Sequence, residues 1–555
     1  MKPRTYFHLR PGFPWGIPLI LIALLAALLP ARSPVEAFAL LVQATQTPGS
    51  GFDVFLPVIL SRGGSASTPI PTATTPAPTV TTPAPTATTP APTATTPAPT
   101  TTTPAPTATT PAPTATTPAP GSPTGFFLPW ILQGEAQATD GPSLAVDANG
   151  GIHVAYTAYT SDADGNRPAY YTYCPGNCTS QASFSDPVIF NGKIDHVNLA
   201  LDPQGRPRIM WVGIDPLAEK LSAYVYLSCD SGCTNLANWQ SARIVALDNT
   251  LPHNSRFFAL DPQGRPGLIF YLGWSGASNG TYFVHCQSGC LNPANWQHAL
   301  VSPAELEFPV LVFDHAGLPR VAGSYLDTSS DPALGFLVYL ECDANCQNIT
   351  QGAAFPIHTC ALCDMPKGYL DLAFDSLNHP RLTLYTGPID PGRGLNADTL
   401  YYIYCNANCG DFNASVWDGY SLGLAAGVGT YARLVIDAQN RPRLVYEDVS
   451  YGLQYAWCQA GCETASPTWQ TLLADSSADL DQTEPVPPIP PCQVAGWFSG
   501  KRPSLALDPS GSPRIAYDAE HWQGLEPVNN PPGNPGCPGF RMDQINARFT
   551  LFNQP

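Results

Sequence analysis

Beyond residue 140, apolar and polar positions follow a repeating order. An apolar run ends in aspartate, a turn containing glycine or asparagine follows, and a second apolar run begins. Each such phrase predicts a β-hairpin, because short apolar runs are separated by turn-forming residues. The copies are 143–156, 198–211, 257–270, 310–323, 371–384, 433–446 and 504–517, with aspartates Asp147, Asp202, Asp261, Asp314, Asp375, Asp437 and Asp508.

A second pattern follows each of the first six phrases. An aromatic run ends in the spacing CxxxC, and a further run follows that Trp239, Trp296, Trp417 or Trp469 opens in four of the units. Two hairpins give four antiparallel strands per unit. A lone four-stranded sheet cannot bury both faces, so seven units predict an all-β, seven-bladed β-propeller. A parallel α/β fold is disfavoured because no stretch of helical periodicity with caps occurs, and a linear solenoid because neither end carries a polar capping repeat.

The chain before the repeats has a different composition. Lys2, Arg4 and Arg10 precede an apolar run from Ile17 to Leu29, which predicts a cleaved export signal or an uncleaved anchor over 1–39. A short extended segment (40–64) comes next. In 65–124 the sequence TTPAP recurs every seven residues, which predicts a disordered linker. The propeller is expected over 125–555, with blades starting near 142, 197, 256, 309, 370, 432 and 503. We therefore expect a secreted or surface-tethered protein.

Two hexamers of similar sequence flank the linker, Phe55–Leu60 and Phe127–Leu132. The seventh unit offers only three strands, at 504–508, 513–518 and 545–552. The segment 126–132 precedes the first unit and has no partner in it. We therefore expect this segment to pair with 545–552 as the outer strand of the seventh blade, which would join the two ends of the domain.

The chain has 16 cysteines, an even number that suits an oxidising compartment. Six CxxxC pairs lie at the turn between the third and fourth strands, where a metal would find only two thiols per unit. We expect all 16 to form disulfides and no metal site. The expected pairs are Cys174–Cys178, Cys229–Cys233, Cys286–Cys290, Cys342–Cys346, Cys405–Cys409, Cys458–Cys462, Cys360–Cys363 and Cys492–Cys537.

One of these turns resembles a known family. The residues Ser228, Asp230, Gly232 and Thr234 stand in the order Ser-x-Asp-x-Gly-x-Thr, which is similar to the Asp-box of bacterial neuraminidase repeats. That turn lies between the third and fourth strands of sialidase-like propeller blades. The resemblance implies a degenerate sialidase-like propeller, in which the Asp-box is structural. The other five turns keep only fragments of the motif.

Charge limits the partners. The chain carries 25 basic and 42 acidic residues, a net charge of -17. Such a field repels phosphate backbones, so nucleic acid is not an expected partner. No phosphate loop or metal-protease motif occurs, and we expect no cofactor. The expected partner is an extracellular glycan or protein, with membrane contact only through an uncleaved N-terminal segment, and the protein is expected to be a monomer.

Residues just before each inner strand are expected to ring the mouth of the central channel, where propellers carry their sites. Two hypotheses follow. The first is a glycan- or protein-recognition module without catalysis, in which these groups form a solvated rim. The second is a sialidase-like hydrolase with an arginine clamp (Arg256, Arg433, Arg502), a nucleophile (Tyr369 or Tyr431 beside Glu307) and an acid (Asp140 or Asp195). The candidate binding residues are Asp140, Asp195, His196, Arg256, Glu307, Tyr369, Tyr431, Arg433 and Arg502.

The second hypothesis departs from the sialidase pattern, because the Arg-Ile-Pro motif of the first blade is absent and those enzymes have six blades. Five further arginines follow the hairpin turns, on the face opposite the mouth. We expect them to pair with neighbouring aspartates or aromatics as a repeated structural device. They are Arg208, Arg320, Arg381, Arg443 and Arg514.

Overall fold

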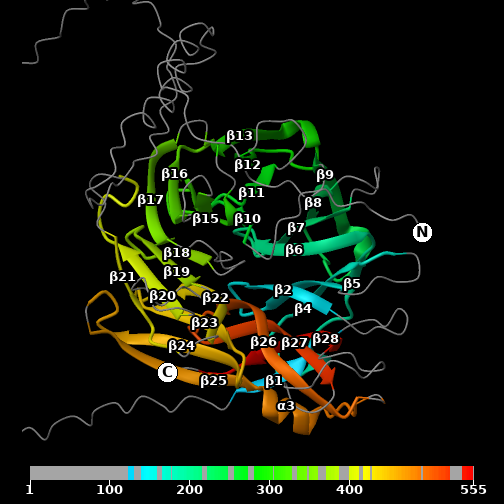
Figure 1. Ribbon diagram of the computed structural model, residues 1–555. Helices are drawn as coiled ribbons and strands as arrows, with labels where there is room; N and C mark the ends of the chain where they lie inside the picture. The colour runs from blue at the N-terminus through cyan, green and yellow to red at the C-terminus, as the bar shows by residue number, and fades with distance from the viewer. Residues whose placement is uncertain are drawn as a thin grey trace, which may run out of the picture. The chain divides into compact units, whose positions relative to one another are not determined.

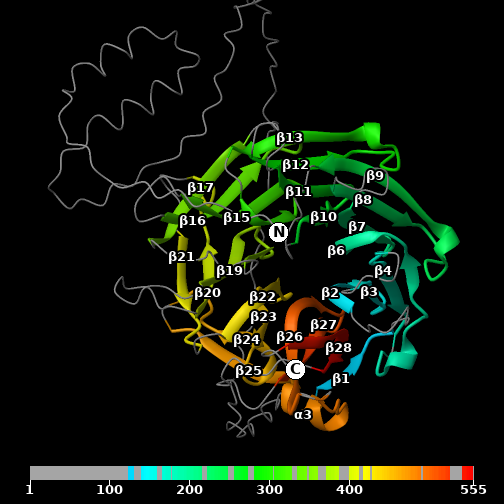
Figure 2. The same cartoon turned by 45° about the vertical axis from the view of Figure 1, so that its right-hand side comes forward.

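The strands form seven separate four-stranded antiparallel sheets. Figures 1 and 2 show the sheets following one another around a common axis. The predicted all-β, seven-bladed propeller is confirmed. The computed structural model describes residues 123–129, 139–158, 165–176, 178–214, 222–247, 256–272, 280–303, 306–327, 334–346, 349–359, 370–386, 399–411, 417–424, 428–464, 466–488, 490, 492–524 and 541–553. The predicted signal or anchor, the segment 40–64 and nearly all of the linker lie outside these residues.

Within each blade the strands follow one another from the inner to the outer edge. Blade one has β2 (Thr139–Val146), β3 (Ile152–Ala158), β4 (Ala169–Cys174) and β5 (Val188–Phe190). Blade two has β6 (Lys193–Leu201), β7 (Pro207–Ile214), β8 (Ser222–Cys229) and β9 (Trp239–Leu247). Blade three has β10 (Phe258–Leu260), β11 (Pro266–Leu272), β12 (Gly280–Cys286) and β13 (Trp296–Ser302).

The remaining blades continue in the same order. Blade four has β14 (Glu307–Phe313), β15 (Pro319–Asp327), β16 (Leu334–Cys342) and β17 (Ile349–Thr359). Blade five has β18 (Leu370–Phe374), β19 (Pro380–Thr386), β20 (Thr399–Cys405) and β21 (Trp417–Ser421). Blade six has β22 (Val428–Ile436), β23 (Pro442–Asp448), β24 (Gly452–Ala460) and β25 (Thr468–Ser476). Blade seven has β26 (Val494–Leu507), β27 (Pro513–Gly524), β28 (Arg541–Leu551) and β1 (Thr124–Phe127).

The aspartate that ends each inner strand organises the first hairpin turn. In all seven blades its Oδ1 accepts the backbone N–H groups two and four residues later, at 2.8 to 3.0 Å. A short carboxylate side chain can cap a turn in this way, because it reaches backbone donors that the strands leave unpaired. The repeated aspartate is therefore a turn-forming residue.

Aromatic rings join neighbouring blades. A tyrosine on a third strand meets, edge to face, an aromatic ring of the next blade, with centroids 5.0 to 5.9 Å apart. Such contacts contribute beyond the area that they bury. This explains why a tryptophan so often opens the outer strand. The pairs are Tyr171–Trp239, Tyr226–Trp296, Tyr339–Trp417, Tyr402–Trp469 and Tyr455–Phe552.

The six CxxxC disulfides are confirmed. In three blades the indole N–H of the following tryptophan donates to the carbonyl of the second cysteine, at 2.8 or 2.9 Å. The bridge and the indole thus close the same turn. Cys492 is also disulfide-bonded, but Cys537, Cys360 and Cys363 lie outside the described residues. The bridges fit a protein made in an oxidising compartment.

The seventh blade closes as predicted, with a strand from the N-terminal side on its outer edge. β1 pairs antiparallel with β28, from Thr124 opposite Leu551 to Phe127 opposite Arg548. In Figure 2 the blue β1 lies beside the red β28. The strand begins two residues earlier than the predicted 126–132. Leu128 follows the strand, donates its N–H to the Ala547 carbonyl at 2.9 Å and is 1% exposed.

The rest of blade seven is longer than expected from the sequence. β26 has 14 residues and β27 has 12, and both extend beyond the predicted 504–508 and 513–518. A short helix, α3 (Ser477–Thr483), packs against β26 and places Leu480 beside Trp497. The Asp481 carboxylate accepts the Trp497 N–H at 2.7 Å. The helix was not predicted, because its single apolar anchor is too little for a periodic signal.

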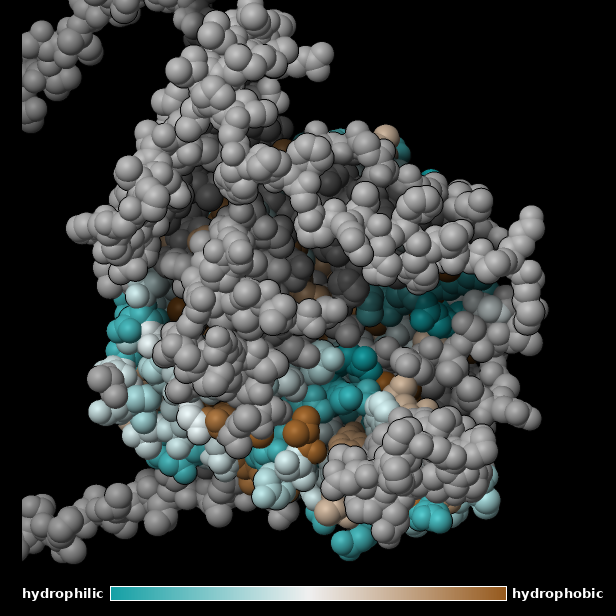
Figure 3. Space-filling model, viewed as in Figure 1, coloured by the Kyte–Doolittle hydropathy of each residue, from teal (hydrophilic) through white to brown (hydrophobic). Residues whose placement is uncertain are grey.

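On the face shown in Figure 3, described residues with hydrophobic side chains form small separate patches among hydrophilic ones. The large apolar residues that are exposed are scattered over several blades. No helix within the described residues is long and apolar enough to cross a membrane.

Candidate functional site at the mouth of the central channel

A cavity of about 310 Å³ runs between the inner strands, and residues from all seven blades line it. We call its two ends the mouth end, where the inner strands begin, and the turn end, where they reach the repeat aspartates. The charged and imidazole side chains that line it come from five blades and include Asp371, the first residue of the fifth repeat phrase. We call this set the mouth cluster, and it comprises His196, Arg256, Asp371, Arg433 and Arg502.

The first residue of the repeat phrase links neighbouring inner strands near the mouth in four of the blades. In four blades its side chain accepts a backbone N–H from the inner strand of another blade, at 2.8 to 3.3 Å. The four acceptors are chemically different, although they occupy equivalent positions. They are Ser143, Asn198, Asp371 and Ser504.

A bulge lies just before this position in four of the inner strands. Gly141, Phe308, Tyr431 and Arg502 each stand two residues before the phrase and have φ between 46° and 56°. The strand register shifts at the same places. Bulges redirect side chains, and a left-handed conformation costs a residue other than glycine about 1–3 kcal/mol. Two predicted site residues, Tyr431 and Arg502, are held in this unfavourable conformation.

Asp371 is the centre of the mouth cluster. It is fully buried, and its carboxylate accepts from Arg256 at 3.0 and 3.2 Å and from the Leu434 N–H at 2.8 Å. Arg256 belongs to blade three and Asp371 to blade five, so this ion pair joins two blades that are separated by blade four. Burial lowers the pKa of Arg433; Asp371 opposes this shift and the Arg256 charge adds to it. Two arginines thus crowd around one carboxylate.

Arg502 is held by a second group of charges, between blades six and seven. Its Nε donates to Asp518 at 2.7 Å, and Asp518 also accepts the Gly141 N–H at 3.0 Å. Lys501 pairs with Glu520 at 2.6 Å. Burial raises the pKa of the nearby Glu447. Sequence reasoning missed these three carboxylates, although each comes after the apolar run of a second strand.

One predicted site residue with a described side chain, Asp195, does not join this cluster. Asp195 pairs with Arg167 and is not among the residues that line the cavity. Asp140 belongs to β2 and Glu307 to β14, and Tyr369 lies outside the described residues. The structure therefore brings together His196, Arg256, Arg433 and Arg502 of the predicted set.

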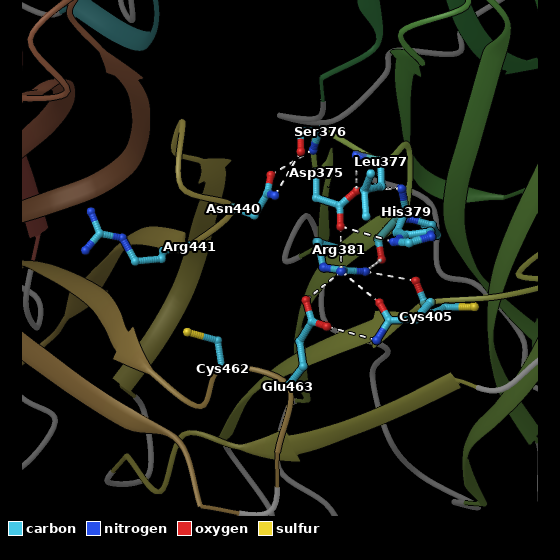
Figure 4. A network of polar contacts seen from close by, with 12 residues as sticks. Asp375, Ser376, Leu377, His379, Arg381, Cys405, Asn440, Arg441, Cys462 and Glu463 are labelled. Carbon is cyan, nitrogen blue, oxygen red and sulfur yellow. Dashed lines mark hydrogen bonds and ion pairs between the residues drawn. The ribbon is translucent and has the colours of Figure 1, made fainter. Parts of the chain in front are cut away.

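The arginines at the turn end have a different role. Each of the five pairs with the aspartate of its own turn. Figure 4 shows the network of blade five, in which Arg381 donates to Asp375 and the Cys405 carbonyl, both at 2.8 Å, and to Glu463 of blade six. Arg381 is 2% exposed. The predicted structural role of these arginines is confirmed.

The turn that resembles an Asp-box is also held by contacts between an aspartate and arginines. Its Asp230 accepts from Arg208 at 2.7 Å and pairs with Arg206 at 3.2 Å. Gly232 has φ of 60°, which suits glycine at this tight turn. The residues of this motif therefore serve the turn and lie at the end of the molecule opposite the mouth cluster. Among the described residues no group of three or more His, Cys, Asp or Glu could hold a metal ion.

No family model matches the chain, and no curated protein matches it. Solved structures with a similar fold include a protein of unknown function from Dyadobacter fermentans (11% identity, 78% of this chain and 98% of that chain, TM-score 0.37). Another is the NanB sialidase of Streptococcus pneumoniae (10% identity, 76% and 70%, TM-score 0.37). A third is an α-L-arabinofuranosidase of Fusarium graminearum (10% identity, 59% and 93%, TM-score 0.34). At this level of similarity, function has to be inferred from the site.

Proposed function

We propose that the protein is a secreted or surface-tethered recognition module that binds an extracellular glycan or protein at the mouth of its channel without catalysis. The observation that carries the proposal is the mouth cluster itself. Its side chains come from five blades and line one cavity. The arginines at the turn end, by contrast, pair with the aspartates of their own turns. Disulfides, the apolar N-terminal run and the Thr/Pro-rich linker support an extracellular location.

The contacts of the cluster favour binding over chemistry. Arg256 and Arg502 are already oriented by the carboxylates of Asp371 and Asp518, so both guanidinium groups are held in place for an oxygen-rich ligand. A sialidase-like hydrolase remains the second candidate, because Arg256 and Arg433 approach the same point and Tyr431 lies two residues from Arg433. In that mechanism the arginines would clamp a carboxylate and a tyrosine would attack the sugar.

The test compares two arginines at opposite ends of blade six. The purified protein is screened against a panel of glycans and extracellular proteins, and the Kd of each bound ligand is measured again with R433Q and, as a control, R441Q. Arg441 pairs with Asp437 at the turn end. We expect R433Q to weaken binding at least about tenfold, because a charge-assisted contact is lost, and R441Q to leave the Kd unchanged.

Binding that is equally strong in all three proteins would show that the mouth cluster is not the site. If the protein releases the fluorophore from a fluorogenic sialoside, and this activity is lost in R433Q but kept in R441Q, the hydrolase is the correct function and the recognition module is not.

A further inference from the structure

The channel wall changes character along its length. Near the mouth it is polar and charged. The two residues before each repeat aspartate, by contrast, are apolar in all seven blades and half-buried. Those that line the cavity include Leu201, Leu260, Phe313 and Val435. The turn end of the cavity is therefore apolar where the mouth end is charged.

The charge at the mouth end has an excess of one sign. Arg502 is paired with Asp518, whereas Arg256 and Arg433, which both line the cavity, share a single carboxylate, that of Asp371. This occurs in a chain whose net charge is -17, so the local positive charge is not a consequence of composition. An anion beside Arg433 would relieve its crowding by Arg256, which contributes to the lowered pKa of Arg433.

From these two properties we infer that the part of the ligand that enters the channel is a carboxylate joined to an apolar tail. The carboxylate lies against Arg256 and Arg433, and the tail extends along Leu260, Phe313 and Val435 toward the turn end. This inference rests on the proposed function and narrows its ligand. A sugar without an apolar group would leave the apolar wall at the turn end in contact with water. A small anion would contact only the charged mouth end.

The experiment measures calorimetric binding of decanoate, below its micelle concentration, to the disulfide-bonded protein. Acetate supplies the charge without the tail, and decanol supplies the tail without the charge. We expect one decanoate per chain, with acetate and decanol each at least about tenfold weaker. Decanoate no tighter than either of them, or bound at several sites, would overturn the inference.

Variants at the two ends of the cavity test the placement. R433Q and L260N are each expected to weaken decanoate at least about tenfold. The matched controls are R441Q and L377N; Leu377 lies in the turn of blade five and is 70% exposed. Both controls should bind like the parent. If L260N does not fold, V435T places a hydroxyl at the same depth with little change in shape. Unchanged binding by the variant at this depth would overturn the inference.

Failure of the inference can be separated from failure of the proposed function. A glycan or protein ligand that depends on Arg433 but is not displaced by decanoate would overturn the inference and leave the proposed function standing. Decanoate that displaces this ligand, with R433Q weakening both, supports the two together.

Discussion

The two ends of the inner strands follow different rules. At the turn end every blade has the same aspartate with the same pair of backbone hydrogen bonds, and five blades add an arginine. At the mouth end, equivalent positions hold serine, asparagine, phenylalanine, valine, aspartate and arginine. Contacts that recur in every blade serve the blade. Residues that differ between equivalent positions do not serve a contact that every blade needs, and the mouth cluster is built from such residues.

The largest expected loss of stability comes from removing the closing strand β1. The smaller losses expected from changes at either end of the inner strands can be compared with it. A chain that starts at Glu135 lacks Phe126, Phe127 and Leu128, whereas one that starts at Gly121 keeps them. Phe127 contacts Trp497, with ring centroids 5.5 Å apart, and the Arg548 guanidinium lies 4.6 Å from its ring. We expect the shorter chain to lose several kcal/mol, a large part of a typical domain stability of about 5–15 kcal/mol. Melting curves of the two chains check this, and equal midpoints would contradict it.

The second prediction compares the two ends within blade six. D437A at the turn end leaves the buried Arg443 without its carboxylate, and we expect a loss of about 3–5 kcal/mol. R433Q at the mouth removes a charge that its buried surroundings disfavour, so its stability should stay within about 1 kcal/mol of the parent. Urea unfolding of both variants measures the difference. A larger loss for R433Q than for D437A would show that the mouth is structural.

The third and smallest effect concerns blade one, where His153 stands at the position that holds arginine in five of the other six blades. Its Nε2 lies 3.5 Å from Asp147, and its Nδ1 lies 2.7 Å from the Tyr171 hydroxyl. Burial lowers the pKa of His153 to about 4, against the opposing effect of Asp147. The unfolded chain has a histidine pKa of about 6.5 and binds the proton first. Stability is therefore complete above about pH 6.5 and falls as the pH decreases toward 4.

We expect H153Q to lose less stability than the parent between pH 7 and pH 5, as measured by urea unfolding at both values. His285, whose pKa is also lowered by burial, remains in both proteins, so the difference isolates His153. Parallel pH dependence of parent and variant would contradict the assignment.

The sequence was sufficient for features that depend on local chemistry. Turn residues, alternating apolar runs and the CxxxC spacing predicted the blades and the six bridges, because each signal lies within a few residues of its effect. The closing strand was predicted by counting strands, because the seventh unit offers only three of its own. The mouth was only partly predictable. Arg256 and Asp371 meet across 115 residues, and the left-handed conformations of Tyr431 and Arg502 are imposed by the packing of neighbouring strands. Nothing adjacent to these residues in the sequence signals either outcome.

The pairing of β1 with β28 has a consequence for biosynthesis. The Thr550 hydroxyl donates to the Thr124 carbonyl, and the two residues are 426 positions apart. Because a chain is made from its N-terminus, β1 must wait without its partner until nearly all of the repeats have left the ribosome. Blade seven can therefore close only after β28 has been synthesised. A product interrupted before β28 keeps an open sheet edge in blade seven, which invites aggregation or proteolysis, so only chains that include the last strand would persist.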